Sequence, residues 1–203
     1  ILTEKPDWNT RKKRRIEKVN LNGPDPTANR IFWILVIACL LAARSAYPEQ
    51  PTPLKPPAYI ATILRNAEIQ HELPIGLAVC IAWHESEYKP TALSRYVGGY
   101  RSRGLMQIYH KHQNEIVSKY TNIPTKLFDW KNPRHSAQAG CGYLAYLIDR
   151  FDGDLYLAVL AYNWGEGNVS ALIAGLFDWD DIPAHCANYA ENVLWMLDNV
   201  VGL

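Results

Sequence analysis

The sequence of 203 residues lacks the spacing of cysteines and histidines that is typical of a zinc site. No two of its four cysteines form a Cys-x-x-Cys pair, and no histidine cluster joins them. Zinc ligands come at short, regular spacings, so we expect no metal centre. The glycine patterns Gly-x-Gly-x-x-Gly and Gly-x-x-x-x-Gly-Lys-Ser/Thr are also missing, which argues against the usual nucleotide-binding folds. The cysteines are Cys39, Cys80, Cys141 and Cys186.

The chain also lacks a strong excess of charge of either sign, since its formal net charge is +1. The two ends differ, however. Residues 1–30 hold eight Lys and Arg against four Asp and Glu, whereas residues 58–203 hold eleven against fifteen. A nucleic-acid-binding protein carries its basic charge on the folded domain, so we expect no nucleic-acid partner.

No apolar run reaches the roughly 20 residues that a membrane-spanning helix needs. The longest run, residues 31–43, follows basic residues at 11–15 and precedes Ala43-Arg44-Ser45. This order is typical of a secretory signal, and a retained membrane anchor is the main alternative; a buried core helix fits the basic flank less well. The sequence begins with Ile1, which leaves open a non-standard start codon or a fragment.

Three segments follow from this organisation. Residues 1–46 are predicted to be a basic N-terminus plus a signal peptide or membrane anchor that contacts the membrane. Residues 47–57 contain five prolines and predict a semi-rigid linker. Residues 58–203 are predicted to be one domain, exported to the periplasm or tethered there to the inner membrane.

Apolar residues of the predicted domain recur at helical spacing, as do Ile60, Ile63, Leu64 and Ile69, and no convincing alternating strand or internal repeat is present. The pattern predicts an all-α fold, or nearly so. Asn132-Pro133 and Asp154 are expected helix caps, and Asn163 to Gly167 an expected turn. The predicted helices cover residues 58–71, 75–88, 111–120, 133–151, 155–163, 168–175 and 184–200.

Glu85 is the candidate catalytic residue. It lies at the end of a largely apolar helix, just before the break at Pro90. A carboxyl group among apolar neighbours tends to stay protonated near neutral pH, as a general acid requires. Most glutamates at helix ends are simply solvated, and position alone does not decide between the two interpretations.

Four blocks in a fixed order favour the catalytic interpretation. They are Glu85-Ser86 with Pro90, Ala92 and Ser94; Gly104-Leu105-Met106-Gln107-Ile108; Ala161-Tyr162-Asn163-Trp164-Gly165-Glu166-Gly167-Asn168-Val169; and Ile182-Pro183 with Tyr189 and Val193. Over roughly residues 58–198 this order resembles the soluble lytic transglycosylase family, relatives of goose-type lysozyme. Several blocks in the right order are far more specific than one short motif.

The resemblance implies a lysozyme-like helical domain that cleaves the MurNAc–GlcNAc β-1,4 bond of peptidoglycan glycan strands. By position, Glu85 would be the acid and then the base. Ser94 would lie near the scissile sugar, Met106 and Gln107 would line the cleft, Tyr162 and Asn163 would form its opposite wall, and Tyr189 would reach the site from the last helix. No metal or organic cofactor is implied.

The residue types fit a mechanism with one carboxylate. Glu87 points to another helix face and is expected to be solvated, and His84 is expected to face away from the acid. The substrate's 2-acetamido group can replace a second carboxylate, and attack by the C6 hydroxyl then gives a 1,6-anhydro end. Two features depart from the family: a longer, cationic loop at residues 95–103, and Trp164 where a small residue is common.

Two other functions remain open at this point. A hydrolytic muramidase would use the same acid with water, and a non-catalytic glycan-binding assembly component would keep the fold alone. The small size resembles members that open the wall for secretion, conjugation or phage-entry machines, so an envelope-spanning complex is a further expected partner. A disulfide is feasible in the periplasm, but its pairing cannot be read from the sequence.

Overall fold

The computed structural model describes residues 55–201, with side chains up to Asn199. The predicted signal or anchor segment and most of the proline-rich linker lie outside the described residues, so their assignment stays a prediction. Within the described part, no helix has the length and apolar character that crossing a bilayer requires.

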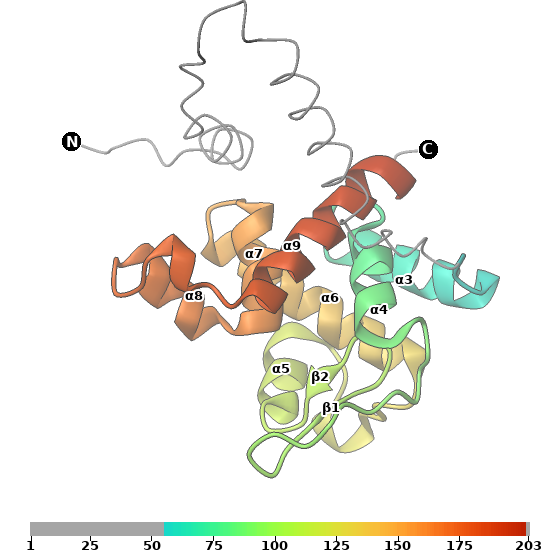
Figure 1. The fold of residues 1–203 in the computed structure, drawn as a ribbon. Coiled ribbons are helices and arrows are strands. Elements are labelled where there is room, and N and C mark those ends of the chain that lie inside the picture. The colour runs from blue at the N-terminus through green and yellow to red at the C-terminus, as the bar shows by residue number, and fades with distance from the viewer. Residues whose placement is uncertain (1–54, 202–203) are drawn as a thin grey trace, which may run out of the picture. The chain divides into compact units, whose positions relative to one another are not determined.

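The described residues form a mostly helical fold, which confirms the predicted class (Figure 1). Helix α7 is buried along Leu157–Ala161 and packs against both α6 and α9, while α4 packs against α3 and α9. A helix buried on nearly all sides marks the centre of a bundle. The α-helices are α3 (Ala58–Gln70), α4 (Leu77–Ser86), α5 (Gln113–Tyr120), α6 (Pro133–Arg150), α7 (Leu155–Trp164), α8 (Glu166–Ile173) and α9 (Ala184–Met196), followed by a π-helical turn (Leu197–Val201).

Short polar side chains start two helices where the sequence predicts them. The side chain of Asn132 accepts a hydrogen bond from the Arg134 N–H at 3.0 Å, with Pro133 in the first helical position of α6. Asp154 accepts from the Leu157 N–H at 3.1 Å at the start of α7. Each contact satisfies an amide that has no partner within its helix.

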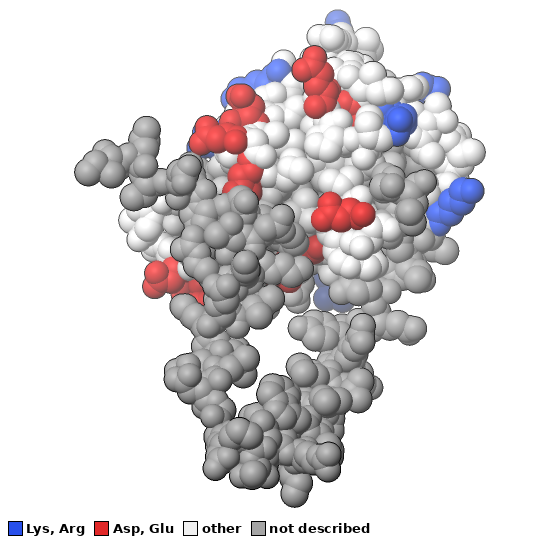
Figure 2. Space-filling view, turned by 90° about the horizontal axis from the view of Figure 1, so that it is seen from above, with Lys and Arg blue, Asp and Glu red and all other residues white. Residues whose placement is uncertain are grey.

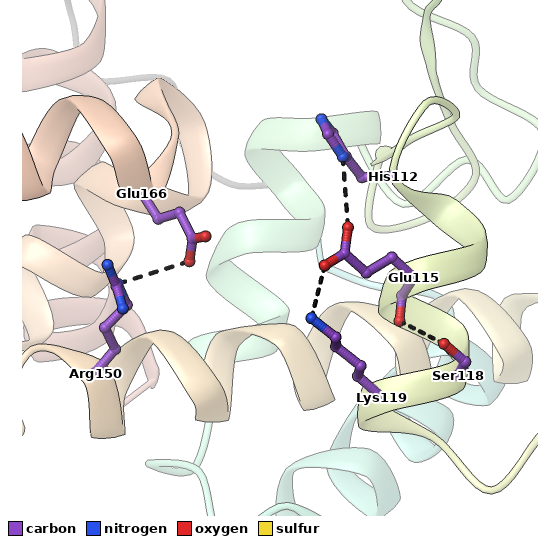
Figure 3. A network of polar contacts seen from close by, with 6 residues as sticks. All are labelled: His112, Glu115, Ser118, Lys119, Arg150 and Glu166. Carbon is purple, nitrogen blue, oxygen red and sulfur yellow. Dashed lines mark hydrogen bonds and ion pairs between the residues drawn. The ribbon is translucent and has the colours of Figure 1, made fainter.

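Charged pairs support the helices on the outer surface (Figure 3). Glu115 pairs with Lys119 one turn later in α5 at 2.7 Å and lies 3.8 Å from His112. Glu166, in the first turn of α8, lies 3.7 Å from the Arg150 guanidinium at the end of α6. Exposed pairs contribute little to stability because water and salt screen them, so the buried apolar faces supply most of the stability.

The structure corrects several expectations from the sequence. The turn expected over Asn163 to Gly167 is confined to Gly165, because α7 continues to Trp164 and α8 begins at Glu166. Ile69 is 60% exposed, and the buried positions in that turn of α3 are Ala67 and Glu68. The expected loop also contains strand pairing: β1 (Ser102–Arg103) pairs antiparallel with β2 (Ile108–Tyr109). The short helical turns η1 (Thr125–Leu127) and η2 (Trp179–Asp181) complete the elements.

Glu68 explains how α3 and α4 are joined. Its fully buried carboxylate accepts a hydrogen bond from the Ala78 N–H, in the first turn of α4, at 2.8 Å. Burial raises the pKa of Glu68, while hydrogen bonds from backbone amides at the start of α4 lower it. Glu68 therefore caps α4 from a neighbouring helix, where the positive end of the helix dipole favours a carboxylate.

Replacing Glu68 tests this cap. We expect Glu68→Ala to lower the free energy of unfolding by about 2–4 kcal/mol, since it removes a cap and leaves a cavity. Glu68→Gln keeps the acceptor oxygen and the volume, so it should lose less than half as much. Denaturant unfolding at pH 7 measures both, and equal losses for the two variants would contradict the capping role.

Candidate active site

Glu85 lies in the last turn of helix α4, and this helix packs against α9 (Figure 1). The helix ends at Ser86, and the next two residues, Glu87 and Tyr88, have positive φ angles of 49° and 62°. The Ser86 hydroxyl donates to the Leu105 carbonyl at 2.8 Å and also lies 3.1 Å from the Ala82 carbonyl. This buried side chain fastens the end of α4 to the Gly-Leu-Met-Gln block.

Tyr189 of α9 reaches Glu85. The Tyr189 hydroxyl donates a hydrogen bond to Glu85 Oε1 at 2.6 Å. Burial raises the pKa of Glu85 to about 7, and the hydrogen bond from Tyr189 opposes that rise. Burial and the nearby Glu85 carboxylate raise the pKa of Tyr189 well above its ordinary value, so the phenol remains a donor.

A second phenol lies in the same environment. The Tyr162 hydroxyl, on α7, donates to the Met106 carbonyl at 2.8 Å. Burial raises the pKa of Tyr162 well above its ordinary value, with a further contribution from the charge of Glu85. The side chain of Tyr143 on α6 packs beside it, with the ring centroids 5.8 Å apart. Tyrosines from α7 and α9 therefore lie near the carboxyl group, and neither supplies a positive charge.

The Gly-Leu-Met-Gln block is held by close packing against α6. The Met106 N–H donates to the buried Ser136 hydroxyl at 3.0 Å. The Met106 side chain lies against Gly140, where an added Cβ would come within 2.6 Å of it. Met106 is fully buried, so its side chain does not line a cleft, contrary to the expectation from the family resemblance. Its carbonyl accepts the hydrogen bond from Tyr162.

Gln107 and Ser94 are tied to the loop that precedes the block. Gln107 has a φ angle of 47°, and its side-chain amide donates to the carbonyls of Ala92 and Gly104 at 3.1 and 2.8 Å. The exposed Ser94 hydroxyl accepts from the Ser102 N–H at 2.9 Å. The exposed Asn163 lies next to Tyr162 near the end of α7. The roles expected for these side chains toward a sugar stay predictions.

Two neighbours of Glu85 in the sequence behave differently from each other. Glu87 is exposed and pairs with Lys89 at 2.7 Å, in line with a solvated charge. His84, expected to face away from the site, instead packs edge-on against Tyr189, with the ring centroids 5.7 Å apart. Burial lowers the pKa of His84, which favours the neutral imidazole beside the acid's hydrogen-bond partner.

The sequence analysis did not identify the residues that hold the elements of the site together. Glu68, Ser136 and Gly140 act through contacts between segments distant in the sequence, and only Glu68 gave a signal, as a charge within the apolar stripe of α3. Among the described residues, no group of three His, Cys, Asp or Glu side chains could hold a metal ion. The cysteines in that part of the chain, Cys80, Cys141 and Cys186, are buried and free.

Removing the Tyr189 hydroxyl tests the electrostatics of the site. The hydrogen bond favours the carboxylate form of Glu85, so Tyr189→Phe should raise the pKa of Glu85 further above 7. NMR titration of the carboxyl carbon in protein labelled at glutamate measures this. Tyr143→Phe is the control, since Tyr143 does not bond to Glu85. A pKa that stays constant or falls in Tyr189→Phe would contradict the arrangement.

Known proteins share this sequence and fold. The model of the family "Transglycosylase SLT domain" matches residues 62–176, more than half of the chain. The peptidoglycan transglycosylase gp16 of Escherichia phage T7 is 34% identical over 119 residues, which cover 56% of this chain and 8% of that protein. The chain thus spans only a small part of this relative.

Two solved structures show the same fold. The 70 kDa soluble lytic transglycosylase Slt70 of Escherichia coli has a TM-score of 0.54 and 26% identity, over 66% of this chain and 22% of that one. An inactive mutant of the lytic transglycosylase Slt from Pseudomonas aeruginosa has a TM-score of 0.57 and 22% identity, over 67% and 23% of the two chains. By the match over residues 62–176, the chain belongs to the transglycosylase SLT domain family.

Proposed function

We propose that this protein is a peptidoglycan lytic transglycosylase that cleaves the MurNAc–GlcNAc β-1,4 bond and leaves a 1,6-anhydroMurNAc end. The observation that carries the proposal is the half-buried Glu85 carboxyl, with a pKa of about 7 and a hydrogen bond from Tyr189. A carboxyl with such a pKa can both donate and accept a proton near neutral pH. The similar proteins, which are named as transglycosylases, support the same reaction.

The reaction proceeds in two proton transfers through the same carboxyl. Protonated Glu85 gives its proton to the glycosidic oxygen as the bond from the MurNAc C1 breaks. The substrate's own acetamido oxygen stabilises the positive charge at C1, because within residues 55–201 no second carboxylate is recorded beside the Glu85 carboxyl, whose side-chain partner is Tyr189. The Glu85 carboxylate then takes the proton of the C6 hydroxyl as its oxygen bonds to C1, which restores the acid without consuming water.

The surrounding residues suit this cycle. Tyr189 can hold the Glu85 carboxylate between the two steps, because its own high pKa keeps it protonated. Gln107, Ser94 and Asn163 are proposed to bind hydroxyl and acetamido groups of the sugar. Tyr162 is proposed to hold the Gly-Leu-Met-Gln block in place through its hydrogen bond to the Met106 carbonyl. Holding the C6 hydroxyl close to C1 favours the intramolecular attack over attack by water.

Replacing the acid tests this function. The full chain, Glu85→Gln and Glu87→Gln are incubated with bacterial sacculi, and the released muropeptides are identified by mass spectrometry. We expect anhydro ends from the full chain and from Glu87→Gln, and a rate at least about 100-fold lower from Glu85→Gln. Glu87 is a matched control because it lies two residues away but is exposed.

The products also separate the other functions. Hydrated reducing ends instead of anhydro ends would make the protein a muramidase. Binding of sacculi with no release by the unaltered chain would favour a glycan-binding assembly component.

We propose further that residues 1–46 direct the domain to the periplasm, as a signal or an anchor, and that it opens the wall for an envelope-spanning machine. The basic residues before the apolar run 31–43 support export. Residues 1–57 fused to alkaline phosphatase, which needs periplasmic disulfides, should give active enzyme. Leu35→Arg, which places a charge in the apolar run, should abolish that activity. An inactive unaltered fusion would contradict export.

A further inference from the structure

A β-hairpin over residues 93–103 stands out from the rest of the described domain. Its arms are joined by antiparallel bridges between Leu93 and Arg103 and between Val97 and Tyr100. Gly98 and Gly99 at its tip have φ angles of +58° and +83°. Positive φ at both central residues is typical of a type I′ turn, which fits the twist of a two-stranded hairpin. The longer loop noted in the sequence is therefore an ordered projection, below β1 in Figure 1.

The hairpin presents exposed aromatic rings together with cations. The Arg101 guanidinium lies 4.5 Å from the ring centroid of Tyr96, and the Lys111 ammonium lies 6.0 Å from that of Tyr100. Tyr96 is 65% exposed and Tyr100 is 40% exposed. Tyr109 of β2 supports the hairpin, since its hydroxyl donates to the Val97 carbonyl at 3.0 Å. Stacking on a ring limits the motion of a guanidinium and presents its N–H groups in a fixed plane.

The charge on this segment is of one sign only. Residues 88–114 contain five Lys and Arg and no Asp or Glu, although the whole span 58–203 carries more acidic than basic residues. Among residues 55–201, the structure records no ion pair for Arg95, Arg101 or Lys111. Figure 2 shows another face, on which both acidic and basic side chains are visible. The hairpin thus concentrates positive charge with no carboxylate to neutralise it.

The base of the hairpin is fixed to the candidate active site. The Gly104 N–H and the Gln107 side-chain amide both donate to the Ala92 carbonyl, at 2.9 and 3.1 Å. The carbonyl of the next residue, Leu105, accepts a hydrogen bond from the hydroxyl of Ser86, which directly follows Glu85. Four residues in each arm span about 13 Å. A ligand on the hairpin therefore lies within a short distance of the bond that Glu85 would cleave.

We propose that this hairpin binds the carboxylates of the peptide stems carried by the glycan strand under cleavage. The proposal rests on the function proposed above and adds to it a preference for strands that carry stems. The sugars of a stripped strand offer few negative charges, whereas each stem ends in a carboxylate that Arg95 and Arg101 can bind through paired N–H groups. Exposed Tyr96 and Tyr100 can pack against the stem's amide planes. Phosphate groups of wall polymers are the alternative ligand that the test separates.

The test compares Arg95→Gln/Arg101→Gln with the control pair Lys126→Gln/Lys131→Gln, which removes the same charge from exposed positions outside the hairpin. Both are made in the full chain and assayed on glycan strands with tetrapeptide stems and on the same strands stripped by an amidase. We expect the arginine pair to raise KM about five- to tenfold on stem-bearing strands at ~50 mM salt, with kcat unchanged. On stripped strands its KM should change less than twofold, and the control pair should match the unaltered chain on both.

Binding to Glu85→Gln, with and without the arginine changes, separates this proposal from the function itself. If the unaltered chain releases nothing but stem-bearing strands bind Glu85→Gln more tightly than Glu85→Gln/Arg95→Gln/Arg101→Gln, the reaction is wrong and the hairpin's role stands. Three outcomes would each overturn the stem-binding role. One is an equal change in KM on both substrates, and another is an equal effect of the arginine pair and the control pair. The third is that a phosphate polymer, but not free tetrapeptide, competes with the strands for binding.

Discussion

The hydrogen bond from Ser86 to the Leu105 carbonyl is the contact on which the rest of the site depends. It joins the end of α4 to a block of four residues that has no regular secondary structure of its own. Because Glu85 precedes Ser86, the same contact fixes where the carboxyl group lies relative to Met106 and Gln107. At its other end, α4 is held by Glu68, so both ends of the helix are bound to other segments.

Burial raises the pKa of the Glu85 carboxyl, and the groups recorded around it are phenols instead of charged side chains. A lysine or arginine at the position of Tyr189 would lower the pKa of Glu85 and remove the acid, whereas a second carboxylate would raise that pKa further. Tyr189 donates one hydrogen bond and stays neutral, so it lowers the pKa of Glu85 only slightly and leaves it near 7. His84, held neutral by burial, completes this uncharged setting.

Local signals in the sequence predicted most of the helices, and contacts between distant segments account for what it did not predict. The caps at Asn132 and Asp154 depend on neighbours within three residues, so they can be read directly. The burial of Met106 depends on Gly140, 34 positions later, and the cap of Glu68 acts on another helix. The order of the four blocks indicated the site because it reflects a whole fold, whereas Glu85 alone was ambiguous.

Acidic and basic residues are separated along the sequence of the domain. Residues 151–203 contain eight Asp and Glu and no Lys or Arg, whereas residues 88–114, which include the hairpin, contain five Lys and Arg and no Asp or Glu. Within the Debye length of about 8 Å at physiological salt, such fields are only partly screened. If the hairpin binds stem carboxylates as proposed, this field would not steer a neutral sugar strand, whereas it would repel the stem carboxylates from the acidic residues of 151–203 and attract them toward the hairpin. Charges that do not contact the scissile bond would then help to decide how a strand lies across Glu85.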